Sequence, residues 1–352
     1  MPAVAADAAA AATVAAPAAE SSRLLPSGLR LHIVTGKGGT GKSTVAAALA
    51  IALASGGRRV LLAEVEGRQG IAQLFDTPPL PYEERRVATA PGGGEVFALA
   101  IDAEDALLDY LETFYGLKRA GRALKRFGVV DFATTVAPGM RDVLLTGKVK
   151  ESVVRTARGR HTYDAVVLDA PPTGRISRFL NVTEEVAGLA RAGPIKGQAD
   201  GVITLLHSSQ TAVHIVTILE EMPVQETVDA VAELGAVGLP VGAVIVNMVR
   251  EPLLSEADLE RAGAGALAGP EVEAEVKAAL SSAGYEATPD LVRGLLAEAV
   301  DHASRVVLER EGRQTLAALA RPTVELPLLP GTVDTGTVYR LAELLVAEGV
   351  VV

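Results

Sequence analysis

The sequence predicts an α/β fold: a doubly wound, mostly parallel β-sheet with helices on both faces, together with a helical subdomain. Short apolar, β-branched segments alternate along the chain with longer segments of helical periodicity. This order is typical of parallel sheets, because parallel strands are joined by crossover helices. A glycine-rich segment also lies between the first strand segment and the first helix segment. Since crossovers are right-handed, the helices are expected to cover both faces.

The predicted elements follow from runs of apolar residues and from their spacing. Strands are expected at residues 29–35, 59–65, 95–101, 163–168, 212–219, 241–247 and 324–328. Helices are expected at 44–54, 102–124, 139–155, 183–192 and 224–234, and through much of 253–320, whereas 78–94 is predicted to be a loop. Residues 1–22 form an Ala-rich tail that we expect to be disordered. Residues 23–352 form one domain without internal repeats, with helical subdomain segments at about 103–160 and 182–210.

Composition excludes several classes of function. The net charge of −10 disfavours a general nucleic-acid binder. The absence of cysteine excludes disulfides, thiol catalysis, iron–sulfur clusters and CxxC zinc sites. The five histidines show no metal-ligand spacing, and His32 and His214 are expected in or beside strands. Apolar runs are too short for a transmembrane helix, and the tail lacks the basic start of a signal peptide, which predicts a cytoplasmic protein.

The glycine-rich segment is a candidate phosphate-binding loop. Residues 36–43 read Gly-Lys-Gly-Gly-Thr-Gly-Lys-Ser and match the P-loop pattern G-x-x-x-x-G-K-[ST]. Glycines let the main chain approach an anion, and the helix that follows adds its positive end, so we predict a site for ATP and Mg²⁺. The predicted nucleotide-binding residues are Gly36, Gly38, Gly39, Thr40, Gly41, Lys42, Ser43 and Thr44. The Lys42 ammonium would pair with phosphate oxygens during catalysis, and the Ser43 hydroxyl would ligate Mg²⁺. The alternative is an ordinary glycine turn before a helix.

Two further residues extend this site. Asp169 ends the predicted strand at 163–168, the position at which a carboxylate supports the metal in P-loop proteins, although a strand-end aspartate can also be structural. Lys37 gives the loop a second lysine, which resembles the deviant-Walker class of P-loop proteins. In that class this lysine contacts the nucleotide bound by a partner subunit. The resemblance therefore implies a catalytic role for Lys37 and a dimer with nucleotide at its interface, whereas the alternative for Lys37 is a solvated surface charge.

The chain resembles the anion-transporting ATPase family, which includes the ArsA arsenite-pump ATPase and the ATPase that targets tail-anchored membrane proteins. The family reads G-K-G-G-V-G-K-[ST] in its P-loop and D-T-A-P-T-G-H-T-L-R-F-L in switch II, and residues 36–43 and 169–180 are similar to these motifs. Pro138-Gly139 is similar to the segment that precedes switch II. Asn247, in Ile-Val-Asn, and Pro327, in Pro-Leu-Leu, match the family's positions beside adenine.

The resemblance is weakest in switch I, where the family reads D-P-A-H-N and its aspartate positions the attacking water. Residues 66–70 here read Glu-Gly-Arg-Gln-Gly, so Glu66 is the candidate for positioning the water. Glu66 is one methylene longer than the family's aspartate, and Gly67 replaces the proline. Because a shift of about 1 Å in a catalytic group can cost roughly 10²-fold in rate, either Glu66 acts from a more flexible loop or hydrolysis is slow.

Two properties of known family members depend on residues that this chain lacks. The family's metalloid site and its dimer-clamping zinc site need cysteine, so arsenite pumping by that route is excluded. The tail-anchor branch binds clients in a Met-rich helical groove, whereas only Met140 lies near the matching regions here, at 103–136 and 182–210. The alternative for the apolar residues there is an ordinary core or dimer contact; these residues are Leu107, Leu108, Leu111 and Phe114.

The sequence therefore predicts a cytoplasmic, Mg-ATP-dependent ATPase that acts as a homodimer, or as a heterodimer with a related subunit, and switches between open and closed states. A protein client is compatible with this prediction. A nucleotide-gated scaffold with very slow hydrolysis remains the alternative. A positioning ATPase of the MinD or ParA kind is disfavoured, because residues 338–352 carry one Arg, two Glu and no Lys, and the net charge is negative.

Overall fold

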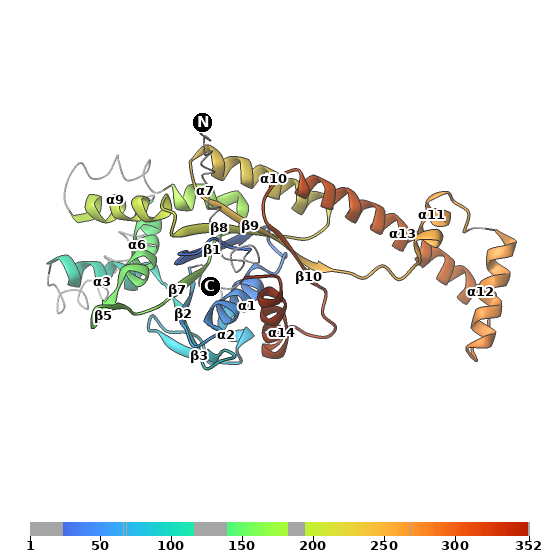
Figure 1. The fold of residues 1–352 in the computed structure, drawn as a ribbon, viewed down its shortest axis with the longest axis horizontal. Coiled ribbons are helices and arrows are strands. Elements are labelled where there is room, and N and C mark those ends of the chain that lie inside the picture. Colours follow the sequence, from blue (N-terminus) through green and yellow to red (C-terminus); the bar gives the residue numbers. More distant parts are fainter. Residues whose placement is uncertain are drawn as a thin grey trace, which may run out of the picture.

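A computed structural model describes residues 24–65, 67, 69–115, 139–181, 194–267 and 269–350. It confirms the α/β fold class: an eight-stranded sheet has the order β10-β9-β8-β1-β7-β2-β4-β3, and only the edge strand β3 is antiparallel (Figure 1). The strands of the sheet are β1 (Leu31–Gly36), β2 (Arg59–Glu64), β3 (Arg85–Thr89), β4 (Glu95–Ala100), β7 (Ala165–Asp169), β8 (Thr211–Thr217), β9 (Val241–Val249) and β10 (Thr323–Pro327). A separate small hairpin pairs β5 (Thr156–Ala157) with β6 (Arg160–His161).

Helices cover both faces of the sheet, as the sequence predicts. The first face packs against α1 (Lys42–Ala54), α2 (Gly70–Leu74) and α14 (Thr335–Ala347). The second face packs against α6 (Met140–Val154), α7 (Thr173–Leu180), α9 (Pro194–Leu206) and α10 (Glu221–Ala236), and α3 (Ala103–Tyr115) lies beside α6. Within β7, Ala165 and Val167 face the α1 side, whereas Val166 and Leu168 face the α6 side. This alternation is the period of two that a strand buried on both faces requires.

Between β9 and β10 the chain forms a helical arm that projects away from the sheet (Figure 1). The arm contains α11 (Glu256–Gly263), α12 (Pro270–Ser282) and most of α13 (Pro289–Ala317). It has a small apolar core of its own, to which each of its helices contributes. The last turns of α13 return to the body, where Leu316 packs in one cluster with Leu219 and Val224.

Some expected elements differ from the structure. The loop prediction for 78–94 is wrong, because β3 forms within it: an edge strand with exposed Arg85 and Arg86 lacks the apolar run of a central strand. The helices α2, α7 and α14 are additional to those predicted. Predictions for residues 1–22 and 183–192, and for the helix beyond residue 115, lie outside the described residues. Among the described residues, no helix combines the length and apolar character needed to span a membrane.

Two histidines form a buried pair in the sheet, which confirms their expected place in strands. His32 on β1 stacks on His214 on β8, with ring centroids 5.4 Å apart and 3.2 Å between His32 Nδ1 and His214 Nε2. The Ala243 N–H donates to His214 Nδ1 at 3.1 Å. His214 must therefore carry its proton on Nε2 and donate it to His32 Nδ1, so both rings are neutral. Burial lowers the pKa of His214 to about 4 and also lowers the pKa of His32.

We expect acid to destabilise the protein through this pair. Because both folded-state pKa values lie below the unfolded value of about 6.5, the unfolded chain gains protons first as the pH falls below that value. Each histidine then removes up to about 1.4 kcal/mol of stability per pH unit, and for His214 this continues to about pH 4. Urea unfolding at pH 7 and pH 5 measures the loss. His161→Gln, at an exposed position, is the control and should retain the full pH dependence. A His214→Gln variant with unchanged pH dependence would contradict the assignment.

Candidate nucleotide-binding site

The predicted phosphate-binding loop lies in the middle of the sheet, at the carboxyl edge of the strands. It connects β1, which pairs with β7 and β8, to α1, which begins at Lys42. Gly41 precedes the helix with φ 84°, in the left-handed region that glycine adopts without strain. At Gly36 a Cβ atom would lie 2.1 Å from the Val216 carbonyl oxygen, so only glycine fits there. The local structure is therefore the strand, glycine loop and helix that the motif requires.

Asn247 holds the loop from β9, which β8 separates from β1 in the sheet. Its Nδ2 donates to the Thr40 carbonyl at 2.9 Å, and a Cβ at Gly41 would lie 2.4 Å from the same nitrogen. The next residue, Met248, has φ 57°, a left-handed conformation that is uncommon for a side chain of this kind and that concentrates at functional sites. Asn247 thus holds the loop in this structure, while its contact with adenine stays a prediction.

Ser43 and Asp169 meet directly below the loop. The Ser43 hydroxyl donates to Asp169 Oδ2 at 2.6 Å, and Asp169, at the end of β7, is only 7% exposed. A hydroxyl and a carboxylate are oxygen donors of the kind that Mg²⁺ prefers. Among the described residues, no group of three or more His, Asp or Glu could hold a metal alone. These two residues fit Mg²⁺ whose remaining ligands are water and phosphate oxygens, as is usual at phosphate sites.

Lys42 stands at the first turn of α1 and is largely withdrawn from water. The residue is 8% exposed, within a helix whose other buried members are apolar or alanine. Burying an ammonium is costly without a compensating negative charge. Its position at the helix N-terminus suits a phosphate, which would supply that charge.

The strand that precedes switch I ends in a buried glutamate that was not among the predicted site residues. Glu64, at the end of β2, is 2% exposed, and its carboxylate accepts from the backbone N–H groups of Gln69 at 2.5 Å and Ile71 at 3.2 Å. It therefore holds the start of α2, and Gly70 in that turn lies beside the Ser43 side chain. Strand alternation carries a signal for Glu64, because it shares the face of Val60 and Leu62, which pack toward α1.

Gly67 in switch I has a backbone conformation that favours glycine. Gly67 has φ 66°, which proline cannot adopt because its ring fixes φ near −65°. A proline at this position, as in the family's motif, is therefore incompatible with the backbone conformation of Gly67. Glu66 itself lies outside the described residues, and its role in positioning water stays a prediction.

The remaining predicted residues fall at the same edge of the sheet. Pro327 ends β10 and pairs in register with Val249, two residues beyond Asn247, so the two positions predicted to contact adenine lie on adjacent strands. Lys37 is about one-third exposed and forms an ion pair of 2.7 Å with Glu226 of α10. The structure thus places the loop, Asp169, Asn247 and Pro327 at one edge of the sheet, while Lys37 pairs with α10 of the same chain.

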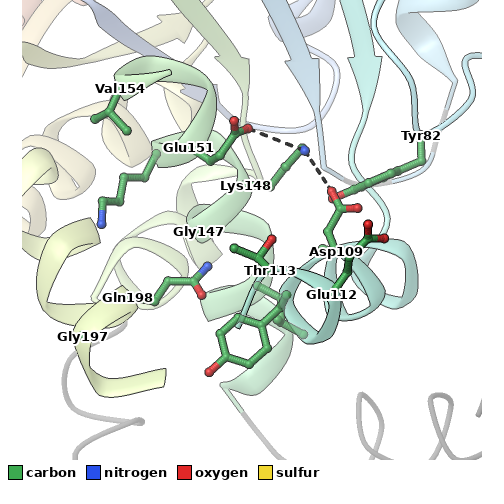
Figure 2. A pocket seen from close by; sticks show the side chains of 14 residues that line it. Tyr82, Asp109, Glu112, Thr113, Gly147, Lys148, Glu151, Val154, Gly197 and Gln198 are labelled. Carbon is green, nitrogen blue, oxygen red and sulfur yellow. Dashed lines mark hydrogen bonds and ion pairs between the residues drawn. The ribbon is translucent and has the colours of Figure 1, made fainter. Parts of the chain in front are cut away.

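A separate cavity of about 880 Å³ lies among α3, α6 and α9, away from the phosphate-binding loop (Figures 1 and 2). Its lining is strongly charged: Figure 2 shows Lys148 between Asp109, at 2.9 Å, and Glu151, at 3.6 Å. Burial raises the pKa of Tyr82, and the neighbouring Asp109 carboxylate raises it further. The described lining of this cavity therefore combines charged with apolar side chains and contains no methionine.

The fold and this site define the chain as a P-loop protein of the α/β class. Residues 29–206, about half of the chain, match the model of the family described as anion-transporting ATPase. This chain also covers almost the whole length of a relative to which it is 56% identical. The two findings together show that the chain belongs to the anion-transporting ATPase family.

The relatives differ in how much of their length this chain covers. Over 326 residues it is 56% identical to the ATPase BagA of Mycobacterium tuberculosis, with 92% of this chain and 94% of that protein covered. A putative ATPase of Mycobacterium bovis matches with the same identity and coverage. The arsenical pump-driving ATPase of Escherichia coli is 27% identical over 234 residues, which is 61% of this chain and 38% of that protein.

Proposed function

We propose that this protein hydrolyses ATP to ADP and phosphate as a Mg²⁺-dependent dimer and uses the nucleotide state to switch between open and closed conformations. The observation that carries the proposal is the 2.6 Å contact between Ser43 and Asp169 under a glycine loop with the required backbone conformation. Family membership supports it, because the relatives are named as ATPases. The sequence-based prediction of a cytoplasmic location belongs to the same proposal.

Each residue has a defined part in this reaction. The loop N–H groups and Lys42 bind and orient the phosphates, and Ser43 and Asp169 hold the metal, directly or through water. Mg²⁺, when bound, neutralises part of the phosphate charge. Glu66 positions the attacking water, and Lys37 contacts the phosphates bound by the partner subunit. Asn247 and Pro327 flank adenine.

A nucleotide-gated scaffold remains the second candidate, and the left-handed Gly67 favours it. If switch I places the Glu66 carboxylate poorly, nucleotide binding stays intact while ATP hydrolysis becomes slow. Phosphate release and sedimentation velocity, both with Mg-ATP, separate the candidates. Turnover together with ATP-dependent association supports the dimeric ATPase, whereas association without turnover supports the scaffold. A protein that neither associates nor turns over ATP contradicts both.

A client, if the protein has one, is expected to be at least partly polar. The cavity among α3, α6 and α9 has charged residues on two of these helices, including Asp109 of α3 and Lys148 and Lys150 of α6. A fully apolar transmembrane helix would desolvate these charges without pairing them, which is unfavourable. Pull-down with an apolar helix and with an amphipathic helix of equal length tests this expectation.

Lys37→Ala is expected to weaken ATP-dependent association while nucleotide binding by the single subunit changes little. The reason is that the lysine in this position of the deviant-Walker loop serves the facing subunit. Calorimetry with Mg-ATP and sedimentation with a non-hydrolysable analogue measure the two effects separately. If Lys37→Ala reduced binding by the monomer as severely as Lys42→Ala, the proposed action across the dimer interface would be wrong.

A further inference from the structure

Glu226 connects the P-loop to switch II through its two carboxylate oxygens. Oε1 forms the ion pair with Lys37 Nζ at 2.7 Å, and Oε2 accepts from the Thr173 hydroxyl at 3.1 Å. Thr173 is the first residue of α7, in the segment that follows Asp169. Glu226 lies on α10, which also contacts α7. The side chain of Glu226 therefore contacts both Lys37 of the P-loop and the first residue of α7.

We propose that Glu226 is a positioning residue that holds Lys37 within its own subunit until nucleotide binding and dimer closure draw the lysine toward a phosphate of the facing subunit. This inference rests on the proposed function. In the structure the Lys37 ammonium is directed to α10 by a full negative charge at 2.7 Å. A polyphosphate carries more charge than one carboxylate and competes for the same ammonium. Transfer of Lys37 leaves Glu226 with its contact to Thr173, so the connection between the P-loop and α7 through Glu226 is broken when the lysine moves.

The expected effect of removing this hold is a gain in association. In the free subunit of Glu226→Gln, Lys37 is no longer held at α10 by a carboxylate. Breaking that contact then costs less free energy when the dimer closes. Both side chains of the pair are about one-third exposed, at 31% and 33%. An ion pair at such a position contributes little, so the apparent association constant in Mg-ATP should rise by about two- to fivefold.

The contact itself can be tested on the nucleotide-free protein. Acetic anhydride acylates the lysine nitrogen, so a lysine whose nitrogen is engaged by a carboxylate at 2.7 Å is less accessible to the reagent and reacts slowly. Lys37 should react faster in Glu226→Gln than in wild type, relative to Lys277 on α12 in the same sample. Glu233→Gln is the matched control, because Glu233 lies on α10 and accepts from Ser177 of α7 at 3.1 Å. It removes a second contact between α7 and α10 and should leave Lys37 reactivity unchanged.

The consequence is tested by measuring association in a double-mutant cycle. Glu226→Gln should raise Mg-ATP-dependent association in the wild-type background and have no effect in the Lys37→Ala background. Unchanged Lys37 reactivity in Glu226→Gln, or an equal gain with and without Lys37, overturns the inference. A wild-type protein that does not bind Mg-ATP in calorimetry refutes the proposed function instead, and the modification rates still decide whether Glu226 holds Lys37.

Discussion

Lys42→Ala is expected to abolish binding of Mg-ATP while the protein stays folded. The ammonium supplies the charge that compensates the phosphates, and its removal also relieves the burial of a residue that is only 8% exposed. Alanine is the best helix former, so α1 should still begin at this position. The loss of binding should therefore be separable from a loss of structure.

Thermal or urea unfolding with and without Mg-ATP measures this effect. Ligand at about 100 times its Kd stabilises a folded protein by roughly 2.7 kcal/mol, so wild type should gain stability and Lys42→Ala should not. Lys277→Ala is the control, because Lys277 lies on the projecting α12 and is about half exposed. It should keep the full gain. A full gain in Lys42→Ala would remove this lysine from the site.

Glu66→Gln is expected to lower the rate of ATP turnover by about 10²-fold or more with little change in nucleotide affinity. The amide keeps the size of the side chain and loses the charge that orients and activates water. The variant should therefore accumulate in an ATP-bound state. Single-turnover phosphate release and calorimetry in the same buffer give the rate and the affinity. A Glu66→Gln variant that hydrolyses ATP at the wild-type rate would reduce Glu66 to a surface carboxylate.

Comparison of Asp169→Asn with Glu66→Gln distinguishes a defect in Mg²⁺ binding from a defect in activating the attacking water. Because Asp169 accepts from Ser43 at 2.6 Å, its carboxylate belongs to the predicted metal shell. Asp169→Asn should weaken Mg²⁺-dependent nucleotide binding as well as turnover, whereas Glu66→Gln should affect turnover alone. Titration of Mg²⁺ at fixed ATP separates the two variants.

The part of the site that the sequence predicts is the part fixed by parallel-sheet geometry. A P-loop after one strand and an aspartate after another must meet, because the carboxyl ends of parallel strands lie at one edge. The contact between Ser43 and Asp169 bears this out. The same reasoning places Asn247 and Pro327 at that edge, and the structure adds that their strands are adjacent.

Contacts made by helix faces could not be predicted in this way. The pairing of Lys37 with Glu226 depends on the rotation of α10 over the sheet, and the helical pattern of α10 does not specify it. At the end of β2 the family resemblance directed attention to Glu66. Alternation instead marked Glu64, whose carboxylate organises the loop. The edge strand β3 was missed because exposed arginines hide its pattern.

The projecting arm has a mechanical consequence. Near the carboxyl end of α13, Gly312 packs beside Val224 of α10, the helix that also carries Glu226. The other end of α13 lies at Pro289. At about 1.5 Å per residue, this stretch is a lever of roughly 35 Å whose inner end packs on α10, the helix that carries Glu226. Tilting the lever by about 10° at the fulcrum would displace its tip by roughly 6 Å. A small rotation of α10 that carried α13 with it would thus become a large movement at the far end of the arm.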